Sequence, residues 1–232
     1  MELRSATQGV GGYTAKFDHL AELVGRPAEA ALAQARALDA GPIRGPLHGL
    51  PLAVKDIFDT AELPTEMGSP IYAGNRPRVD AAAVALCRAA GAVVIGKTVT
   101  TELANMTAGV TRNPFNPAHS PGGSSSGSAA AVADFMAPLA LGTQTAGSII
   151  RPAACCGVVG IKPSFGRVPR AGVKPNADSM DTVGGFGRTV ADAALLASVL
   201  AGDARLRTQA PPETLRIGLV QGPDWHQAEE DV

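Results

Sequence analysis

Two short segments rich in glycine and serine carry the residue types from which an acyl-transfer site could be built. Residues 122–128 read GGSSSGS, and residues 145–148 read TAGS. Backbone N–H groups in such segments can stabilise a developing negative charge, and a serine hydroxyl beside them can act as a nucleophile. A loop of this composition is more often an ordinary turn, so both interpretations stay open on the residues alone.

Two further motifs fit known patterns but lack the context that those patterns require. Residues 91–98, GAVVIGKT, fit the phosphate-binding pattern GxxxxGK[ST], which must follow a strand and form a loop. Here a predicted helix precedes the segment and Ala-Val-Val-Ile favours a strand, so we interpret it as a helix–Gly–strand connection. Residues 123–127, GSSSG, fit the nucleophile elbow centred on Ser125, but the proline-rich stretch before them cannot be a core strand.

Composition and charge exclude several classes of function. The 232 residues include 20 Lys+Arg and 21 Asp+Glu, for a net charge of −1, and 4% aromatic residues. A nucleic-acid-binding protein would show a basic excess and stacking aromatics. Three cysteines cannot form a disulfide framework, and four scattered histidines give no zinc-binding spacing. No apolar run reaches the about 18 residues of a membrane span, so we expect a cytoplasmic protein without a membrane or nucleic-acid partner.

The elements that must position these residues alternate between strands and helices along the chain. This order predicts a single α/β domain over residues 1–232, with a sheet covered by helices on both faces and residues 1–13 disordered. Lys55 ends the apolar strand LPLAV, and Asp80 is the expected N-cap of a helix. Residues 143–180 are expected to be mostly turns. Helices are predicted at 28–40, 80–90, 101–106, 126–135 and 190–200, and strands at 50–55, 93–96, 139–142 and 216–220, with a further apolar piece at 158–161.

The Gly/Ser-rich block and four other segments together resemble the amidase signature family. The block spans residues 122–164, and the further matching segments occur in the family's order over about residues 45–220. These segments are GPLHGLPLAVKDIFD at 45–59, GAVVIGKTVTTELA at 91–104, NPFNP at 113–117 and SMDTVGGFGRTVADAALL at 179–196. The resemblance implies a mixed sheet within an α/β fold. It also implies hydrolysis of a carboxamide C–N bond by a Ser–cis-Ser–Lys triad, without metal or organic cofactor.

Each triad member has a matching position in this sequence. The resemblance assigns the lysine to Lys55, the cis-serine to Ser124 and the nucleophile to Ser148. A lysine acts as a base only when it is neutral, and burial among the apolar residues of its strand would lower its pKa by desolvation. Ser124 would then relay the proton from Ser148 to Lys55. The oxyanion-hole and supporting residues that the resemblance implies are Thr145, Ala146, Gly147 and Ser125.

The sequence also departs from the family's pattern. Gln144 stands where an aspartate is common, the arginine that follows the nucleophile is displaced to Arg151, and Gly185 replaces a frequent proline. The chain is also shorter than family members, so we expect it to be the N-terminal portion of the family's fold. A sheet edge left bare in such a portion would pair with other chains, so we expect homo-oligomers. Two rivals to an amidase with a small-molecule amide substrate are a non-catalytic remnant and the amidase-type component of an aminoacyl-tRNA amidotransferase. The Gln144–Arg151 variant favours stand-alone amidases.

Overall fold

A computed structural model of the chain describes residues 28–207 and, beyond them, positions 214, 216, 218, 220, 222, 223 and 225–227. The disorder predicted for residues 1–13 lies outside the described residues. Of the strand predicted at 216–220, positions 216, 218 and 220 are described and have no regular secondary structure. None of the helices in these described ranges has the length and hydropathy that a membrane crossing needs.

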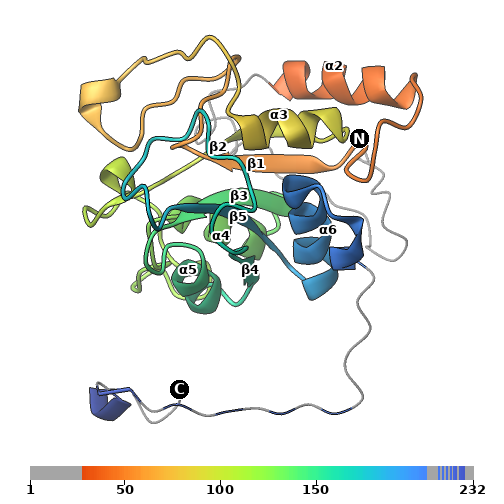
Figure 1. The fold of residues 1–232 in the computed structure, drawn as a ribbon. Helices are drawn as coiled ribbons and strands as arrows, with labels where there is room; N and C mark the ends of the chain where they lie inside the picture. The colour runs from red at the N-terminus through yellow and green to blue at the C-terminus, as the bar shows by residue number, and fades with distance from the viewer. Residues whose placement is uncertain are drawn as a thin grey trace.

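The centre of the fold is a mixed five-stranded sheet with the strand order β2-β1-β3-β5-β4 (Figure 1). Strand β1 runs parallel to both of its neighbours, whereas β5 is antiparallel to β3 and to β4. This confirms the predicted α/β class with a mixed sheet. The strands are β1 (Pro51–Lys55), β2 (Val93–Thr98), β3 (Leu139–Gln144), β4 (Val159–Ile161) and β5 (Thr182–Gly187).

Helices cover both faces of the sheet, as the sequence predicts. Because side chains alternate along a strand, Leu52 and Val54 of β1 face one hydrophobic cluster and Ala53 faces the other. The first cluster includes residues of α3 and α6, and the second includes residues of α4 and α5. The helices are α2 (Ala28–Asp39), α3 (Ala82–Ala89), α4 (Ser126–Ala133), α5 (Ile150–Cys155) and α6 (Val190–Ala201). Short 3-10 turns occupy Pro70–Tyr72, Glu102–Ala104, Ala204–Arg207 and Trp225–Gln227.

The predicted N-cap of the second helix is wrong. Helix α3 begins at Ala82 instead of residue 80, and its N-cap is Ala81, one position after Asp80. The Asp80 carboxylate is used elsewhere: it accepts a hydrogen bond from the backbone N–H of Ala61 at 2.9 Å and pairs with Arg88 Nε at 2.9 Å. Asp80 therefore anchors the preceding loop to the helix instead of capping it.

Two elements were missed in the sequence, and two strands extend further than predicted; β3 continues to Gln144, two residues beyond the expected 139–142 and into the region expected to be turns. Strand β5 and helix α5 lie where turns, or no element, were expected. Strand β2 continues to Thr98, which confirms the strand interpretation of the phosphate-loop-like segment. A 3-10 turn replaces the short helix predicted at 101–106. The three cysteines are free; Cys87 and Cys156 are buried, and Cys155 is exposed.

Candidate active site

The sheet topology brings the candidate residues to one edge. Strands β1 and β3 are parallel, so their last residues, Lys55 and Gln144, lie at the same end of the sheet. Strand β5 runs the opposite way and begins at Thr182, which pairs with Gln144. The segment that starts at Thr145, directly after β3, and Asp181, directly before β5, therefore lie beside the end of β1.

Lys55 is completely buried and contacts two hydroxyl groups. Its Nζ donates hydrogen bonds to Ser124 Oγ and to Thr143 Oγ1, each at 2.8 Å. Desolvation by burial lowers the pKa of Lys55 to about 7, against a smaller upward effect from the negative charge of Asp181. A substantial fraction of this amine is therefore neutral near neutral pH.

Ser124 lies in a segment whose small residues allow close backbone packing. The Gly123–Ser124 peptide bond is cis, and the Ser124 carbonyl accepts a hydrogen bond from Thr101 N at 3.1 Å. A Cβ on Gly123 would lie 2.9 Å from Thr101 Cγ2, and one on Gly127 would overlap the backbone of Val99. The glycines thus let this loop and the start of α4 pack directly on the segment after β2.

The loop that contains Ser148 is held by the side chain of Gln144. Its Oε1 accepts hydrogen bonds from Ile149 N at 2.8 Å and from Ile150 N at 3.0 Å. Its Nε2 donates to the carbonyl of Ala146 at 2.8 Å. In the described part of the chain, the N–H groups of the three residues that complete the loop have no hydrogen-bond acceptor: Ala146, Gly147 and Ser148. These donors are available to a ligand.

The two Gly/Ser segments are joined to each other. Ser125 N donates to the Ser148 carbonyl at 3.3 Å, and Ser125 Oγ donates to the Thr143 carbonyl at 3.2 Å. Ser124 and Ser148 line the same cavity of about 410 Å³. Among the described residues, no hydrogen bond connects their hydroxyl groups. The structure thus brings Lys55 into contact with Ser124, and Ser148 lines the same cavity as Ser124.

Two residues of this site were not singled out in the sequence. Thr143 is the second hydrogen-bond partner of Lys55. Asp181 accepts a hydrogen bond from Thr145 Oγ1 at 2.6 Å and further ones from Asn176 N and Ala177 N. Asp181 belongs to the segment 179–196 that carries the resemblance, and this position was the signal that could have identified it.

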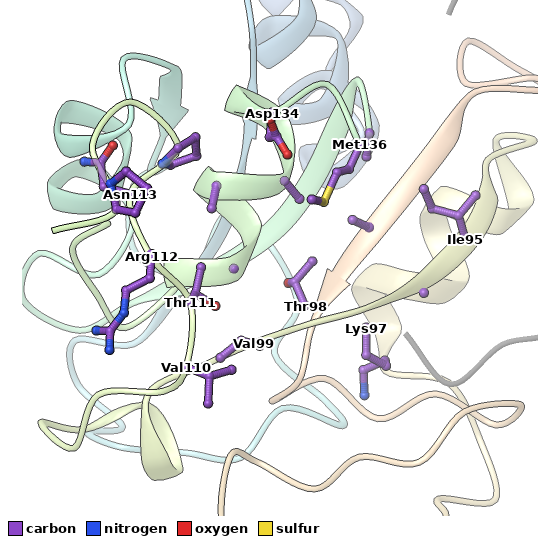
Figure 2. A pocket seen from close by; sticks show the side chains of 18 residues that line it. Ile95, Lys97, Thr98, Val99, Val110, Thr111, Arg112, Asn113, Asp134 and Met136 are labelled. Carbon is purple, nitrogen blue, oxygen red and sulfur yellow. The ribbon is translucent and has the colours of Figure 1, made fainter. Parts of the chain in front are cut away.

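A second cavity of about 390 Å³ lies between β2 and α4 and contains none of the predicted catalytic residues. Figure 2 shows Ile95, Thr98 and Met136 around it.

Lys97, the lysine of the phosphate-loop-like motif, pairs with Asp56 at 2.8 Å. Its Nζ also donates hydrogen bonds to the carbonyl oxygens of Phe58 and Pro64 and to Thr65 Oγ1. Lys97 is therefore committed to protein contacts.

Comparison with solved structures identifies the class of enzymes that share this fold. The peptide amidase from Stenotrophomonas maltophilia is 43% identical with a TM-score of 0.73, over 83% of this chain and 43% of that one. A protein from a structure described as a vestigial complex related to an s-triazine catabolic enzyme is 37% identical with a TM-score of 0.74. It is matched over 87% of this chain and 47% of that one.

The chain belongs to the amidase family, whose sequence model matches residues 14–232. Curated relatives include the A subunit of glutamyl-tRNA(Gln) amidotransferase from Acidothermus cellulolyticus, 50% identical over 75% of this chain and 37% of the relative. The protein of the same name from Chloroflexus aurantiacus is 47% identical over 80% of this chain and 40% of the relative. The chain therefore spans about two fifths of the length of these curated relatives.

Proposed function

We propose that this chain contains the catalytic centre of an amidase that cleaves a carboxamide C–N bond through a serine acyl-enzyme. In this proposal Ser148 is the nucleophile, Ser124 the proton relay and Lys55 the base. The observation that carries it is the 2.8 Å contact between Ser124 Oγ and a buried lysine amine whose pKa is about 7. A base is most effective when its pKa lies near the working pH.

The first chemical step forms the acyl-enzyme. Neutral Lys55 accepts the proton of the Ser124 hydroxyl, and Ser124 takes the proton of Ser148 as the Ser148 Oγ attacks the amide carbon. The carbonyl oxygen becomes an oxyanion, which the free N–H groups of the 146–148 loop can stabilise. The C–N bond then breaks, and the proton held by Lys55 returns through Ser124 to the leaving nitrogen. The products are an ester on Ser148 and a free amine.

The second step regenerates the enzyme through the same two proton carriers. Water now takes the place of Ser148 as the nucleophile, and Ser148 takes the place of the amine as the leaving group. Water attacks the ester carbon while Ser124 and Lys55 accept its proton, and the oxyanion forms again beside the 146–148 loop. The C–O bond to Ser148 breaks, and Ser148 recovers its proton. A carboxylic acid is released, so the net reaction is amide plus water to acid plus amine.

Labelling with an active-site fluorophosphonate, followed by peptide mapping, tests the assignment of the nucleophile. We expect the label on Ser148, complete loss of labelling in Ser148→Ala, and slower labelling at the same site in Ser125→Ala. Ser125 is the matched control because it is a neighbouring serine whose Oγ donates to the Thr143 carbonyl. Recovery of the label on Ser125 would overturn the assignment. A folded wild-type chain that takes up no label would favour the non-catalytic remnant.

A second candidate function is the amidase component of an aminoacyl-tRNA amidotransferase. It is favoured by the names of the curated relatives, which are 50% and 47% identical to this chain. Such a component would release ammonia from an amide donor for transfer to another substrate. Measuring ammonia release from glutamine and from a peptide C-terminal amide separates the two. A stand-alone amidase hydrolyses the peptide amide at least as fast as glutamine.

A further inference from the structure

Ser124 lies between two cavities, of which only one contains the candidate nucleophile. The catalytic cavity, of about 410 Å³, is lined by both Ser124 and Ser148. A further cavity of about 290 Å³, which we call the third cavity, is lined by Ser124 and Thr143 but, among the described residues, not by Ser148. Because Ser124 and Thr143 are the two hydrogen-bond partners of Lys55, the third cavity lies on the lysine side of Ser124.

The lining of the third cavity is polar and carries charges of both signs. Arg170 and Lys174 contribute positive charge, and Asp178 and Asp181 contribute negative charge. Arg170 Nη1 lies 3.9 Å from a carboxylate oxygen of each aspartate, so these opposite charges offset each other. Such a cavity favours a neutral group with hydroxyl or amide functions over an apolar group, which would take water from the polar side chains without replacing its hydrogen bonds.

The proposed reaction fixes where the two halves of an amide substrate lie. Four groups surround the carbon under attack: the Ser148 oxygen, the oxyanion, the leaving nitrogen and the acyl chain. The oxyanion faces the 146–148 loop, and the leaving nitrogen must face Ser124, from which it takes its proton. A substituent on that nitrogen therefore extends past Ser124 into the third cavity, while the acyl chain stays in the catalytic cavity with Ser148.

We infer that the substrate is an N-substituted amide whose amine portion, neutral and polar, occupies the third cavity. This inference rests on the proposed function and adds the class of its leaving group. The size of the cavity supports it, because the ammonia released from a primary amide needs only about the 30 Å³ of a water molecule. A cavity of about 290 Å³ has room for an amine with several carbon and oxygen atoms.

Kinetics on three amides with the same butanoyl group test the inference. Butanamide has no amine substituent, and N-butanoylserinol carries two hydroxymethyl groups on the carbon next to its nitrogen. The third amide is an isostere of N-butanoylserinol in which a methyl group replaces each hydroxyl. We expect the wild-type kcat/KM for N-butanoylserinol to exceed that for the isostere by about 10-fold, the worth of hydrogen bonds that only the hydroxyl groups make. Equal values would overturn the polar character inferred for the amine portion.

A variant that fills the third cavity separates the amine portion from the acyl portion. Ala171 is exposed and lines the third cavity but not the catalytic cavity, so Ala171→Trp should narrow the third cavity alone. We expect the ratio of kcat/KM for N-butanoylserinol to that for butanamide to fall by about 10²-fold, the effect that a misplaced substrate produces.

Two further variants and the shared intermediate serve as controls. Asp178→Trp, at a side chain that is 89% exposed in the same cavity, should lower the ratio in the same direction. Ala33→Trp, at an exposed alanine on α2, should leave it unchanged. Both amides form the same butanoyl-enzyme, so slowing of both by the same factor in Ala171→Trp would place the effect on that shared ester and overturn the inference.

Calorimetric binding to the Ser148→Ala variant separates this inference from the proposed function. Adding Ala171→Trp should weaken the binding of N-butanoylserinol, relative to that of butanamide, by about 10-fold or more. If the wild type hydrolyses none of the amides but this difference in binding appears, the amine site stands and the proposed function fails. If the wild type hydrolyses butanamide but not N-butanoylserinol, the proposed function stands and the inference is wrong. Binding of N-butanoylserinol that Ala171→Trp leaves unchanged also overturns the inference.

Discussion

Two buried lysines at adjacent positions in the sheet have opposite surroundings. Lys55 ends β1 and Lys97 lies near the end of β2, where the parallel register pairs Val54 with Lys97 and Lys55 with Thr98. Lys97 Nζ contacts the Asp56 carboxylate at 2.8 Å and three further oxygen atoms. Lys55 Nζ contacts two hydroxyl groups and, among the described residues, no carboxylate.

The difference lies in what opposes the desolvation of each amine. Burial lowers the pKa of both lysines, but at Lys97 the negative charge and hydrogen bond of Asp56 act against this effect. At Lys55 only the more remote charge of Asp181 does so, and the pKa is about 7. A buried ammonium with a carboxylate partner serves as a structural link, here between β2 and the loop after β1. A buried amine without such a partner is suited to exchange protons.

Substitution of Lys55 should have the largest effect on chemistry. Because Lys55→Met removes the proposed base, we expect the rate of fluorophosphonate labelling to fall by about 10²–10⁴-fold. The melting temperature should not fall, since the variant removes a desolvated amine from the core. Lys55→Arg should not restore labelling because a guanidinium stays protonated. Wild-type labelling by Lys55→Met would remove Lys55 from the mechanism.

Substitution of Lys97 should instead act on stability. Lys97→Met leaves the Asp56 carboxylate buried without its partner, and we expect the free energy of unfolding to drop by about 3–5 kcal/mol in urea titrations. The double variant Asp56→Asn/Lys97→Met should recover part of this loss because no unpaired charge remains. If Lys97→Met kept full stability but lost labelling, the contrast between the two lysines would be reversed.

Substitution of Gln144 tests how far the stability and labelling of the loop around Ser148 depend on this one side chain. Gln144→Ala removes two acceptor contacts and one donor contact, and we expect a loss of about 1–3 kcal/mol of stability together with slower labelling. Gln144→Glu keeps an acceptor for Ile149 N and Ile150 N but cannot donate to Ala146, so its labelling rate should be intermediate. Equal rates for the two variants would show that the donor contact carries the whole effect.

The smallest expected effect is a shift in pH dependence caused by Asp181→Asn. The charge of Asp181 raises the pKa of Lys55, so its removal should lower that pKa and move the midpoint of the labelling profile to more acid pH. The asparagine still offers an oxygen to Thr145. A midpoint that stays fixed or moves to alkaline pH would show that Asp181 does not act on Lys55 through its charge.

The parts of the fold that the sequence predicts are those whose local pattern agrees with their packing. Strands β1 and β3 are apolar runs, and α6 has a capping box at Thr189 and Asp192 and ends at Gly202 in a left-handed conformation. Strand β5 reads TVGGFG, and its glycines hide it from any propensity argument. They are required by neighbouring backbone: a Cβ on Gly185 would lie 2.6 Å from the Ala140 carbonyl oxygen, a contact that only the folded sheet creates.

The candidate site shows the same difference between residues that a local sequence pattern identifies and residues that only contacts in the folded chain identify. Lys55, Ser124 and Ser148 could be proposed because they lie in segments that resemble a known family. Thr143 matches no assigned motif position, and for Asp181 the resembling segment 179–196 marks the position but not its contacts, because these contacts join residues far apart in the chain, such as Lys55 with Thr143 and Thr145 with Asp181. Such contacts depend on the parallel pairing of β1 with β3 and the antiparallel return of β5.

The central claim, that Lys55 is a base because its buried amine lacks a carboxylate partner, is tested most directly by the pH dependence of Ser148 labelling. The rate of wild-type labelling by a fluorophosphonate should rise with pH to a plateau, with a midpoint near pH 7, the pKa of Lys55. The rise follows because only the neutral amine accepts a proton. A rate that is constant between about pH 5 and about pH 9, or a midpoint near the ordinary lysine value of about 10.4, would contradict the account.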